Sequence, residues 1–481
     1  MDIQIDLDDI ALFALLLGAS VAAGEGLRKV GWRPESTRRL VHVLVGLTTA
    51  ASPLWFDVPD GIYILAGLFC LGNAVALARG WIPSMHAVER RSWGTVLFPL
   101  ALVAALVLTW SPLGDRVWAL QAAFTVLALA DPAASLAGGH WGQSSGEGKT
   151  PAGSLTFAVI AMIVGGIVLA AVGPDRGAGW VIAASVSAAA LATVAEALGR
   201  HGWDNLWIVL AVVVGLTVAG GASPGALALA VGLAALFGWG AWRVGALSAS
   251  GALAGTLLAW GLVAIGGWAW AVPALAFFVL SSVLSRLGHK RKAGAHALVE
   301  KGSRRDAGQV LANGGVALAA LGASAFVPSP VLFAVFVGSL AAAAADTWAT
   351  EIGTWIGGPT RRLGLGGRVP PGTSGGMSWG GTLGAVLGAG SVVLPAAGLT
   401  GAGGAWALAV VAAGVAGAIL DTALGATVQA RYRAPDGHLT ERLRIDGVAL
   451  PLAAGRAWLG NDGVNAACTL AGGLLASVWV G

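Results

Sequence analysis

Phe157–Val172 reads FAVIAMIVGGIVLAAV, sixteen consecutive residues without a charged side chain. A helix this apolar approaches the length that crosses the hydrocarbon core of a bilayer, roughly 20 residues. Comparable runs recur along the 481-residue chain, at Ala11–Ala23, Gly94–Trp110, Leu206–Ala219 and Val316–Phe326. The sequence therefore predicts an all-α polytopic integral membrane helix bundle with about 14–16 transmembrane helices.

The composition supports a membrane protein. Charged residues make up 11% of the chain, against about 25% in soluble domains, and the mean hydropathy is +0.78. The 74 glycines suit helices that pack closely in lipid. The first apolar run follows four aspartates instead of a basic segment, so we expect it to stay as a membrane helix. Cys70 and Cys468 form neither a disulfide framework nor a metal cluster.

Lys and Arg gather in alternate loops, which predicts the orientation in the membrane because positively charged loops stay cytoplasmic. The N-terminus is then outside, and the polar motifs face the cytoplasm, here taken as that of a prokaryote. The net charge of +4 is explained by these loops, and no motif indicates a nucleic-acid partner. The basic loops are Arg28–Arg39, Arg79–Arg91, Arg286–Arg305, Arg361–Arg368 and Arg431–Arg444.

One motif, A-D-x-x-A-[ST]-x-x-G, occurs twice. It reads ADPAASLAG at Ala130–Gly138 and ADTWATEIG at Ala345–Gly353. Each copy places a carboxylate at the end of an apolar stretch, where an ionisable group is costly and is a functional candidate by default.

Further matches follow the same order in both parts of the chain. Glu89 and Asp306 precede the two motif aspartates by similar separations, and later come P-x-G-[ST] loops, an acidic residue before A-L-G, and an Asp–Asn or Asn–Asp pair. This order predicts an ancient duplication, with convergent loop composition as the alternative. We expect two membrane domains, residues 1–222 and 223–481.

The acids and the glycine-rich loops suit phosphoryl transfer, which needs positioning, a divalent metal and positive charge around phosphates. Two carboxylates per domain can hold Mg²⁺ while phosphates and waters complete its coordination. The loops Gly138–Thr150 and Gly364–Gly376 can turn backbone N–H groups toward an anion. They match neither the Walker nor the Rossmann spacing. The candidate acids are Asp131 with Glu89 or Glu196, and Asp346 with Glu351 or Asp421.

Plainer interpretations apply to single residues. Asp131 or Asp346 alone could be an interfacial helix cap, and His42 could be a packed interfacial histidine. Most arginines of Arg286–Arg305 could act only as topology signals.

The first half, roughly Arg28–Leu216, resembles the dolichol kinase and phytol kinase family of CTP-dependent polyprenol kinases. The second half, roughly Gly245–Gly481, resembles the phytyl-phosphate kinase family of integral membrane proteins. It departs from that family at Thr422, where Ser is expected after the Asp. The matching pieces are Arg38 and His42, Glu89 to Thr95, Asp131 to Gly138, Gly148 to Ser154, and Glu196 with Asp204 and Asn205 in the first half, and Lys301 to Gly314, Ala345–Gly353, Pro371 to Gly376, and Asn461 to Asn465 in the second.

Together the resemblances imply a bifunctional phosphotransferase of isoprenoid salvage. The first half would phosphorylate an alcohol of the phytol, geranylgeraniol or farnesol class, and the second would convert the monophosphate to the diphosphate. CTP is the implied donor and Mg²⁺ the implied metal. The metal ligands would be Asp131, Glu196, Asp346 and Asp421.

The remaining roles follow from the charges of the residues and from the negative charge that a phosphorylated acceptor brings. Glu89 or His42 would orient or deprotonate the alcohol, and Lys149 would bind the donor phosphates. Lys301, Arg304 and Arg305 would bind the monophosphate. Asp306 and Glu351 complete the catalytic candidates, and the other binding candidates are Arg38, Gly153, Ser154, Asp204, Asn205, Gln309, Asn313, Gly372, Thr373, Ser374, Asn461 and Asp462.

Two other classes of function stay open. A CDP-lipid synthase such as phosphatidate cytidylyltransferase shares the setting, but its H-G-G-x-x-D-R signature is absent. A transporter could also have duplicated membrane halves, although its polar residues would lie near the middle of the spans. For the isoprenoid kinase we expect each polar pocket to open toward lipid as well, because an isoprenoid chain stays among the acyl tails.

Overall fold

The computed structural model describes residues 6–79, 93–111, 114–141, 149–287, 304–363, 367–371, 373–435, 437, 439–445 and 448–478. They form two compact units, Met1–Val231 and Gly232–Gly481. The division lies inside helix α10 (Pro224–Arg243), whereas the expected boundary after residue 222 lies at the turn before that helix.

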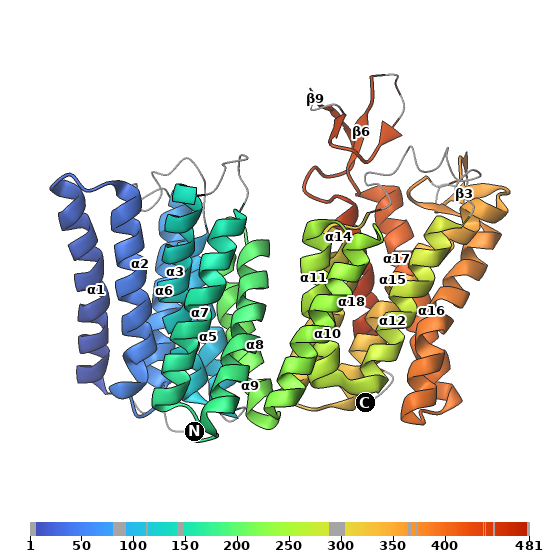
Figure 1. Cartoon of the computed structure of the whole chain (residues 1–481). Coiled ribbons are helices and arrows are strands. Elements are labelled where there is room, and N and C mark those ends of the chain that lie inside the picture. Colours follow the sequence, from blue (N-terminus) through green and yellow to red (C-terminus); the bar gives the residue numbers. More distant parts are fainter. Residues whose placement is uncertain are drawn as a thin grey trace. The chain divides into compact units, whose positions relative to one another are not determined.

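The first unit consists of helices that alternate in direction (Figure 1). A short antiparallel pair of strands joins two of them, with Trp110 opposite Asp115. Its elements are α1 (Leu7–Lys29), α2 (Pro34–Ala51), η1 (Ser52–Leu54), α3 (Asp60–Arg79), α5 (Gly94–Thr109), β1 (Trp110–Ser111), β2 (Gly114–Asp115), α6 (Val117–Trp141), α7 (Pro151–Val172), α8 (Gly177–Leu198) and α9 (Asp204–Gly221).

The second unit combines helices with short strands. Its helices are α11 (Ala249–Gly261), the π-helical turn η2 (Leu262–Gly266), α12 (Gly267–Arg286), α14 (Ala307–Ser324), α15 (Pro330–Ile356), α16 (Trp379–Thr400), α17 (Gly404–Thr427) and α18 (Asn461–Val478). Its strands are β3 (Thr360–Arg362), β4 (Arg368–Val369), β5 (Gly376–Met377), β6 (Arg431–Arg433), β7 (Leu439–Thr440), β8 (Arg444–Ile445), β9 (Val448–Ala449) and β10 (Leu452–Ala454).

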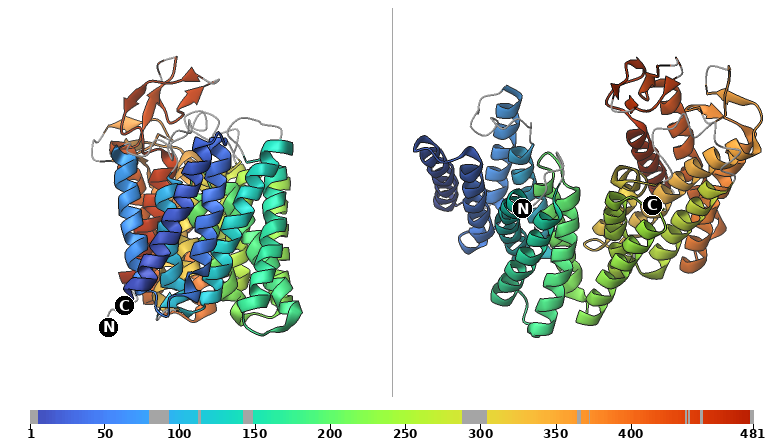
Figure 2. Two further views of the ribbon diagram at one scale, coloured as in Figure 1. Left: turned by 90° about the vertical axis from the view of Figure 1, so that its left-hand side faces the viewer. Right: turned by 45° about the horizontal axis from the view of Figure 1, so that its top comes forward.

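The strands of the second unit form small antiparallel sheets beside the helix ends. β3 lies between β4 and β5, with Arg361 opposite both Arg368 and Met377. β6 lies between β10 and β7, and β8 pairs with β9. The segment β6–β10 projects beyond the ends of the helices in this unit (Figures 1 and 2).

The all-α membrane bundle predicted from the sequence is confirmed. Within the described residues, eleven helices are long and apolar enough to cross a membrane, with α11, η2 and α12 taken together as one of them. Four more helices, α2, α5, α14 and α18, have 16 to 18 residues. These four are not among the membrane-span candidates, so the candidates within the described residues are fewer than the expected 14–16.

Each copy of the repeated motif lies on the central helix of its unit. α6 packs against α2, α5, α7 and α9, and α15 packs against α12, α14, α16, α17 and α18. These are the most buried of the membrane-span candidates. An alanine-rich run precedes the motif in both, and in α15 Ala341–Ala345 are all buried. Small side chains let the neighbouring helices approach closely. Each motif aspartate therefore lies directly after a tightly packed stretch of its helix.

Candidate functional site

In the first unit, the predicted residues meet where α6 and α8 end and α7 and α9 begin. Lys149 lies at the centre of the group. Its Nζ is 2.7 Å from Oε1 of Glu196 and 3.0 Å from Oδ2 of Asp204. The other carboxylate oxygen of Glu196 accepts a hydrogen bond of 3.2 Å from the Ser154 hydroxyl. Two carboxylates, from the end of α8 and the start of α9, therefore contact one ammonium group.

Local sequence explains how this group is held. Thr150 caps α7, since its hydroxyl accepts a hydrogen bond from the amide of Gly153 at 3.1 Å. A Cβ at Gly153 would lie 3.0 Å from the carbonyl oxygen of Ala134, a tight contact, so the glycine favours the close approach of α7 to α6. Asn205 donates to the carbonyl of Gly94 at 3.1 Å and ties the start of α9 to α5.

The ion pairs change the charge state of Lys149 very little. Burial by itself would lower its pKa, but the carboxylates of Asp204 and Glu196 outweigh burial and raise the pKa above the usual value for lysine. Lys149 is therefore protonated throughout the neutral range, as a phosphate-binding or charge-neutralising group must be.

A second group surrounds Asp131. Nε2 of His42 lies 3.9 Å from Oδ2 of Asp131 and 3.2 Å from the carbonyl oxygen of Leu127. The guanidinium group of Arg39 donates to the Ser135 hydroxyl at 3.1 and 3.2 Å. Asp131 also interacts electrostatically with Asp204, Lys149 and Arg38, so the two groups form one polar site. Glu89 lies outside the described residues.

In the second unit, the predicted residues line a pocket of about 420 Å³ formed by α12, α14, α15, α16, α17 and α18 with their loops. Nine sequence candidates contribute to its wall: Arg305, Gln309, Asn313, Asp346, Glu351, Thr373, Ser374, Asp421 and Asn461. These residues extend along the chain from Arg305 to Asn461, so the fold brings most of the second motif set together.

Two aspartates form the acidic part of this pocket. The carboxylates of Asp346 on α15 and Asp421 on α17 are close enough for their charges to interact. Oδ2 of Asp421 is buried and has no hydrogen-bond partner among the described residues. A buried carboxylate oxygen without a partner is unfavourable unless a cation or a donor from a ligand satisfies it.

The acids fit a magnesium site with few protein ligands. Among the residues that the structure describes, no group of three or more His, Cys, Asp or Glu side chains is placed to hold a metal. Mg²⁺ keeps several waters and is commonly bound through one or two carboxylates and the phosphates of a substrate. The pair Asp346 and Asp421 matches that requirement.

Arg305 is fixed in the pocket wall by its backbone. Its amide donates to the carbonyl of Ala246 at 3.2 Å, and its carbonyl accepts from the amide of Ser248 at 2.9 Å. Burial lowers the pKa of Arg305, and the charge of Glu351 opposes that shift. Arginine stays cationic in proteins, so the pocket wall contains a positive charge on a residue whose backbone is held by hydrogen bonds.

Other candidates occupy different places. Asp306 is the N-cap of α14 and forms a reciprocal capping box with Gln309, at 3.0 and 3.2 Å. Arg304 is exposed beside Gly245. Neither of these two residues, nor Asp462 in the first turn of α18, lines the pocket. Lys301 and Gly372 lie outside the described residues.

The structure adds pocket residues that the sequence analysis did not select. Glu441, from the segment between β7 and β8, lines the pocket and interacts with the charge of Asp421. Arg286, at the end of α12, also lines it. Both come from basic segments interpreted as topology signals, and their sequence context has no repeated motif that could have distinguished them.

Comparison with known families agrees with this architecture. Residues 232–473 match the family described as "Integral membrane protein DUF92". The chain belongs to the DUF92 family. The match covers the second unit of this DUF92 protein, from α10 to the last turns of α18.

A curated relative adds a second likeness. The DUF92 protein is 31% identical to the phytol kinase of Synechocystis sp. over 207 residues, which cover 42% of this chain and 87% of the relative. It is therefore a phytol kinase-like multi-pass membrane protein. No solved structure matches the chain.

Proposed function

We propose that this DUF92 protein is a bifunctional membrane kinase. The first unit phosphorylates an isoprenoid alcohol to its monophosphate, and the second phosphorylates that product to the diphosphate. The donor is a nucleoside triphosphate, with CTP favoured by the family resemblance. The observation that carries the proposal is that each unit assembles its own polar site around the aspartate of the repeated motif.

The likeness to phytol kinase supports the first step. The 231 residues that precede the DUF92 match are long enough to hold its 207 matched residues, and the kinase-like motifs Asp131–Gly138 and Glu196–Asn205 lie there. We assign this likeness to the first unit for that reason.

In the first unit, the chain's own residues would position the alcohol and the phosphates. Asp131 and Glu196 would hold Mg²⁺, and Lys149 would neutralise charge on the donor. His42, beside Asp131, would take the proton from the alcohol or orient it, with Glu89 as the other candidate. The alcohol oxygen bonds to the γ-phosphorus, the bond from that phosphorus to the bridging oxygen breaks, and the nucleoside diphosphate leaves.

In the second unit, the acceptor itself carries negative charge. Arg305 in the pocket wall would bind this monophosphate, and Arg286 adds a second cation. Asp346 and Asp421 would hold Mg²⁺, which when bound would neutralise developing charge on the transferred phosphoryl group. The same pocket would thus supply cations for the phosphate of the acceptor and acids for the metal that carries the donor.

The basic loops support an orientation with both sites facing the cytoplasm, where nucleoside triphosphates are available.

The alternative of a CDP-lipid synthase differs in its products. Nucleotidyl transfer releases pyrophosphate, whereas a kinase releases the nucleoside diphosphate.

The test uses the full-length protein in detergent or lipid nanodiscs with labelled CTP or ATP and phytol, geranylgeraniol or farnesol. Asp131→Ala should abolish monophosphate formation and leave conversion of added monophosphate to diphosphate intact. Asp346→Ala should do the reverse. Asp175→Ala, at an exposed loop, is the control and should change neither step. Loss of both steps in either folded single variant would refute separate sites.

A further inference from the structure

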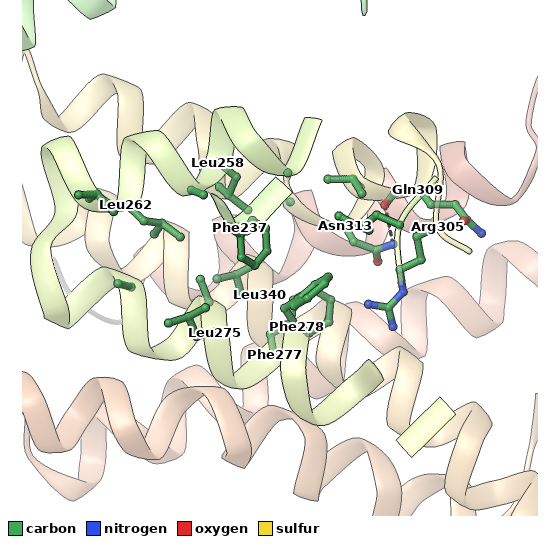
Figure 3. A pocket seen from close by; sticks show the side chains of 18 of the residues that line it. Phe237, Leu258, Leu262, Leu275, Phe277, Phe278, Arg305, Gln309, Asn313 and Leu340 are labelled. Atoms are coloured by element: carbon green, nitrogen blue, oxygen red, sulfur yellow. Dashed lines mark hydrogen bonds between the residues drawn. The ribbon is translucent and has the colours of Figure 1, made fainter. Parts of the chain in front are cut away.

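A second cavity, of about 240 Å³, lies in the second unit between α10, α11, η2, α12, α14 and α15. Most of its wall is apolar. In Figure 3, Arg305, Gln309 and Asn313 lie at one end, Phe237, Phe277 and Phe278 around the middle, and Leu262 and Leu275 at the other end. The cavity therefore has a polar end and an apolar end.

The polar end belongs to both cavities. Arg305, Gln309, Asn313 and Thr347 line the apolar cavity and also the larger pocket that contains Asp346 and Asp421. These residues lie on α15 and on the first turns of α14 with the residue before its cap. A molecule with a charged head and an apolar tail would place the head beside Arg305 and its tail among the phenylalanines.

The apolar cavity also reaches the outer surface of the helices. Three residues of its wall, Leu233, Val263 and Leu275, are 42%, 38% and 41% exposed. Because this surface is apolar and belongs to membrane-span candidates, a hydrocarbon chain could enter sideways from the acyl region of the bilayer.

We propose that this cavity binds the isoprenoid chain of the lipid monophosphate and that the residues at its apolar end determine which chain lengths are accepted. The proposal rests on the proposed second kinase step. Because acyl tails are as apolar as the cavity wall, burial of the chain adds little driving force in a membrane. The cavity instead fixes where the chain ends, and so where the phosphate lies relative to Arg305 and the acids.

The apolar end has an unusual backbone. Leu262, which is 6% exposed, begins the π-helical turn η2, and the following Gly267 has a φ of +63°. Turns of this kind widen a helix locally and occur often at functional sites. Here the turn sets Leu262 at the end of the cavity, opposite Leu275 on α12 (Figure 3).

The experiment fills the apolar end and measures chain-length preference. Leu262→Trp and Leu275→Trp are compared with Val279→Trp, a matched control on α12 that is 48% exposed and outside the cavity wall. The readout is kcat/KM for geranyl, farnesyl and geranylgeranyl monophosphates. For the two cavity variants we expect the preference for the longest chain over the shortest to fall by roughly tenfold or more, with the shortest substrate still converted. Val279→Trp should keep the wild-type preference.

Leu275→Trp tests the proposal even if Leu262→Trp misfolds, because Leu275 is partly exposed and tolerates a larger side chain. Unchanged preference in a folded, active Leu275→Trp variant would overturn the chain cavity and leave the kinase function standing. If the wild-type protein phosphorylates no prenyl monophosphate, the proposed function fails instead.

The cavity can then be tested without catalysis. A geranylgeranyl monophosphate carrying a photoreactive group at its far end should label peptides that contain Leu262 or Leu275. Labelling confined to other helices would overturn the proposal.

Discussion

At the scale of single residues, the first site pairs a buried carboxylate with a single lysine. Glu196 is almost completely buried, with a side chain 4% exposed, and Lys149 is its cationic partner. An ionised carboxylate in such a place is tolerated only when it is paired and hydrogen-bonded. Lys149 supplies the charge and Ser154 the hydrogen bond. The same lysine thus stabilises the fold and, in the proposed function, neutralises charge on the donor.

The stability of the first unit should depend on this lysine. Lys149→Met leaves Glu196 buried without its cation, and removing one partner of a buried pair costs about 3 kcal/mol. Thermal unfolding of the purified protein should shift clearly to lower temperature. Lys29→Met, which removes an exposed lysine at the end of α1, is the matched control and should have no such effect. Equal unfolding temperatures for the two variants would contradict a stabilising ion pair.

The pH dependence of this contribution follows from the raised pKa of Lys149. Since the folded-state pKa lies above that of the unfolded chain, the stabilisation from Lys149 is complete at neutral pH and declines only as the pH rises above roughly 10.

At the scale of elements, glycines of α16 determine how close the motif helix can come. A Cβ at Gly384 would clash with the backbone oxygen of Trp348 on α15, and a Cβ at Gly388 with the backbone oxygen of Ala344. These two α15 residues lie two positions either side of Asp346. Direct backbone approach of this kind requires small residues on one face. The position of Asp346 in the pocket therefore depends on glycines at these two positions of α16.

Gly388→Val should disturb the second site selectively. The added side chain overpacks the α15–α16 contact, at a cost of about 1–3 kcal/mol, and displaces α15 near Asp346. Conversion of monophosphate to diphosphate should fall, while phosphorylation of the alcohol by the first unit should persist. Gly390→Val on the same helix is the control, because a Cβ there meets nothing within 4 Å. A Gly388→Val protein with a normal second step would show that this contact does not position the acid.

At the scale of the whole molecule, two units with separate sites predict that the monophosphate can pass between molecules. Asp131→Ala and Asp346→Ala proteins, reconstituted in the same liposomes, should together convert the alcohol to the diphosphate. The intermediate formed by the Asp346→Ala protein diffuses in the bilayer to the intact second site of the other protein. Chromatography of labelled lipids measures both products.

The double variant Asp131→Ala/Asp346→Ala is the control for this mixture and should form neither product. If the mixture makes only monophosphate while each single variant retains its own step, the intermediate is not released into the membrane.

The sequence by itself determined that the protein lies in a lipid bilayer, that its fold is all-α and which helices carry the repeated motif. Long apolar runs can satisfy their backbone hydrogen bonds in lipid only as helices, so the bundle follows from Phe157–Val172 and its counterparts. The cost of a carboxylate in an apolar stretch was enough to select Asp131 and Asp346, and the repeated order of motifs selected Asp421 as the counterpart of Glu196. Their proposed roles remain predictions.

Only the tertiary structure decided which polar residues share a site. It joined Lys149 to Glu196 and Asp204, brought Glu441 to the second pocket, and assigned Asp306 to the cap of α14. It also revealed the apolar cavity that adjoins Arg305. The physical reason is that helix packing depends on contacts between small residues distributed over many turns. In a chain with 74 glycines, local sequence does not show which of them form a contact.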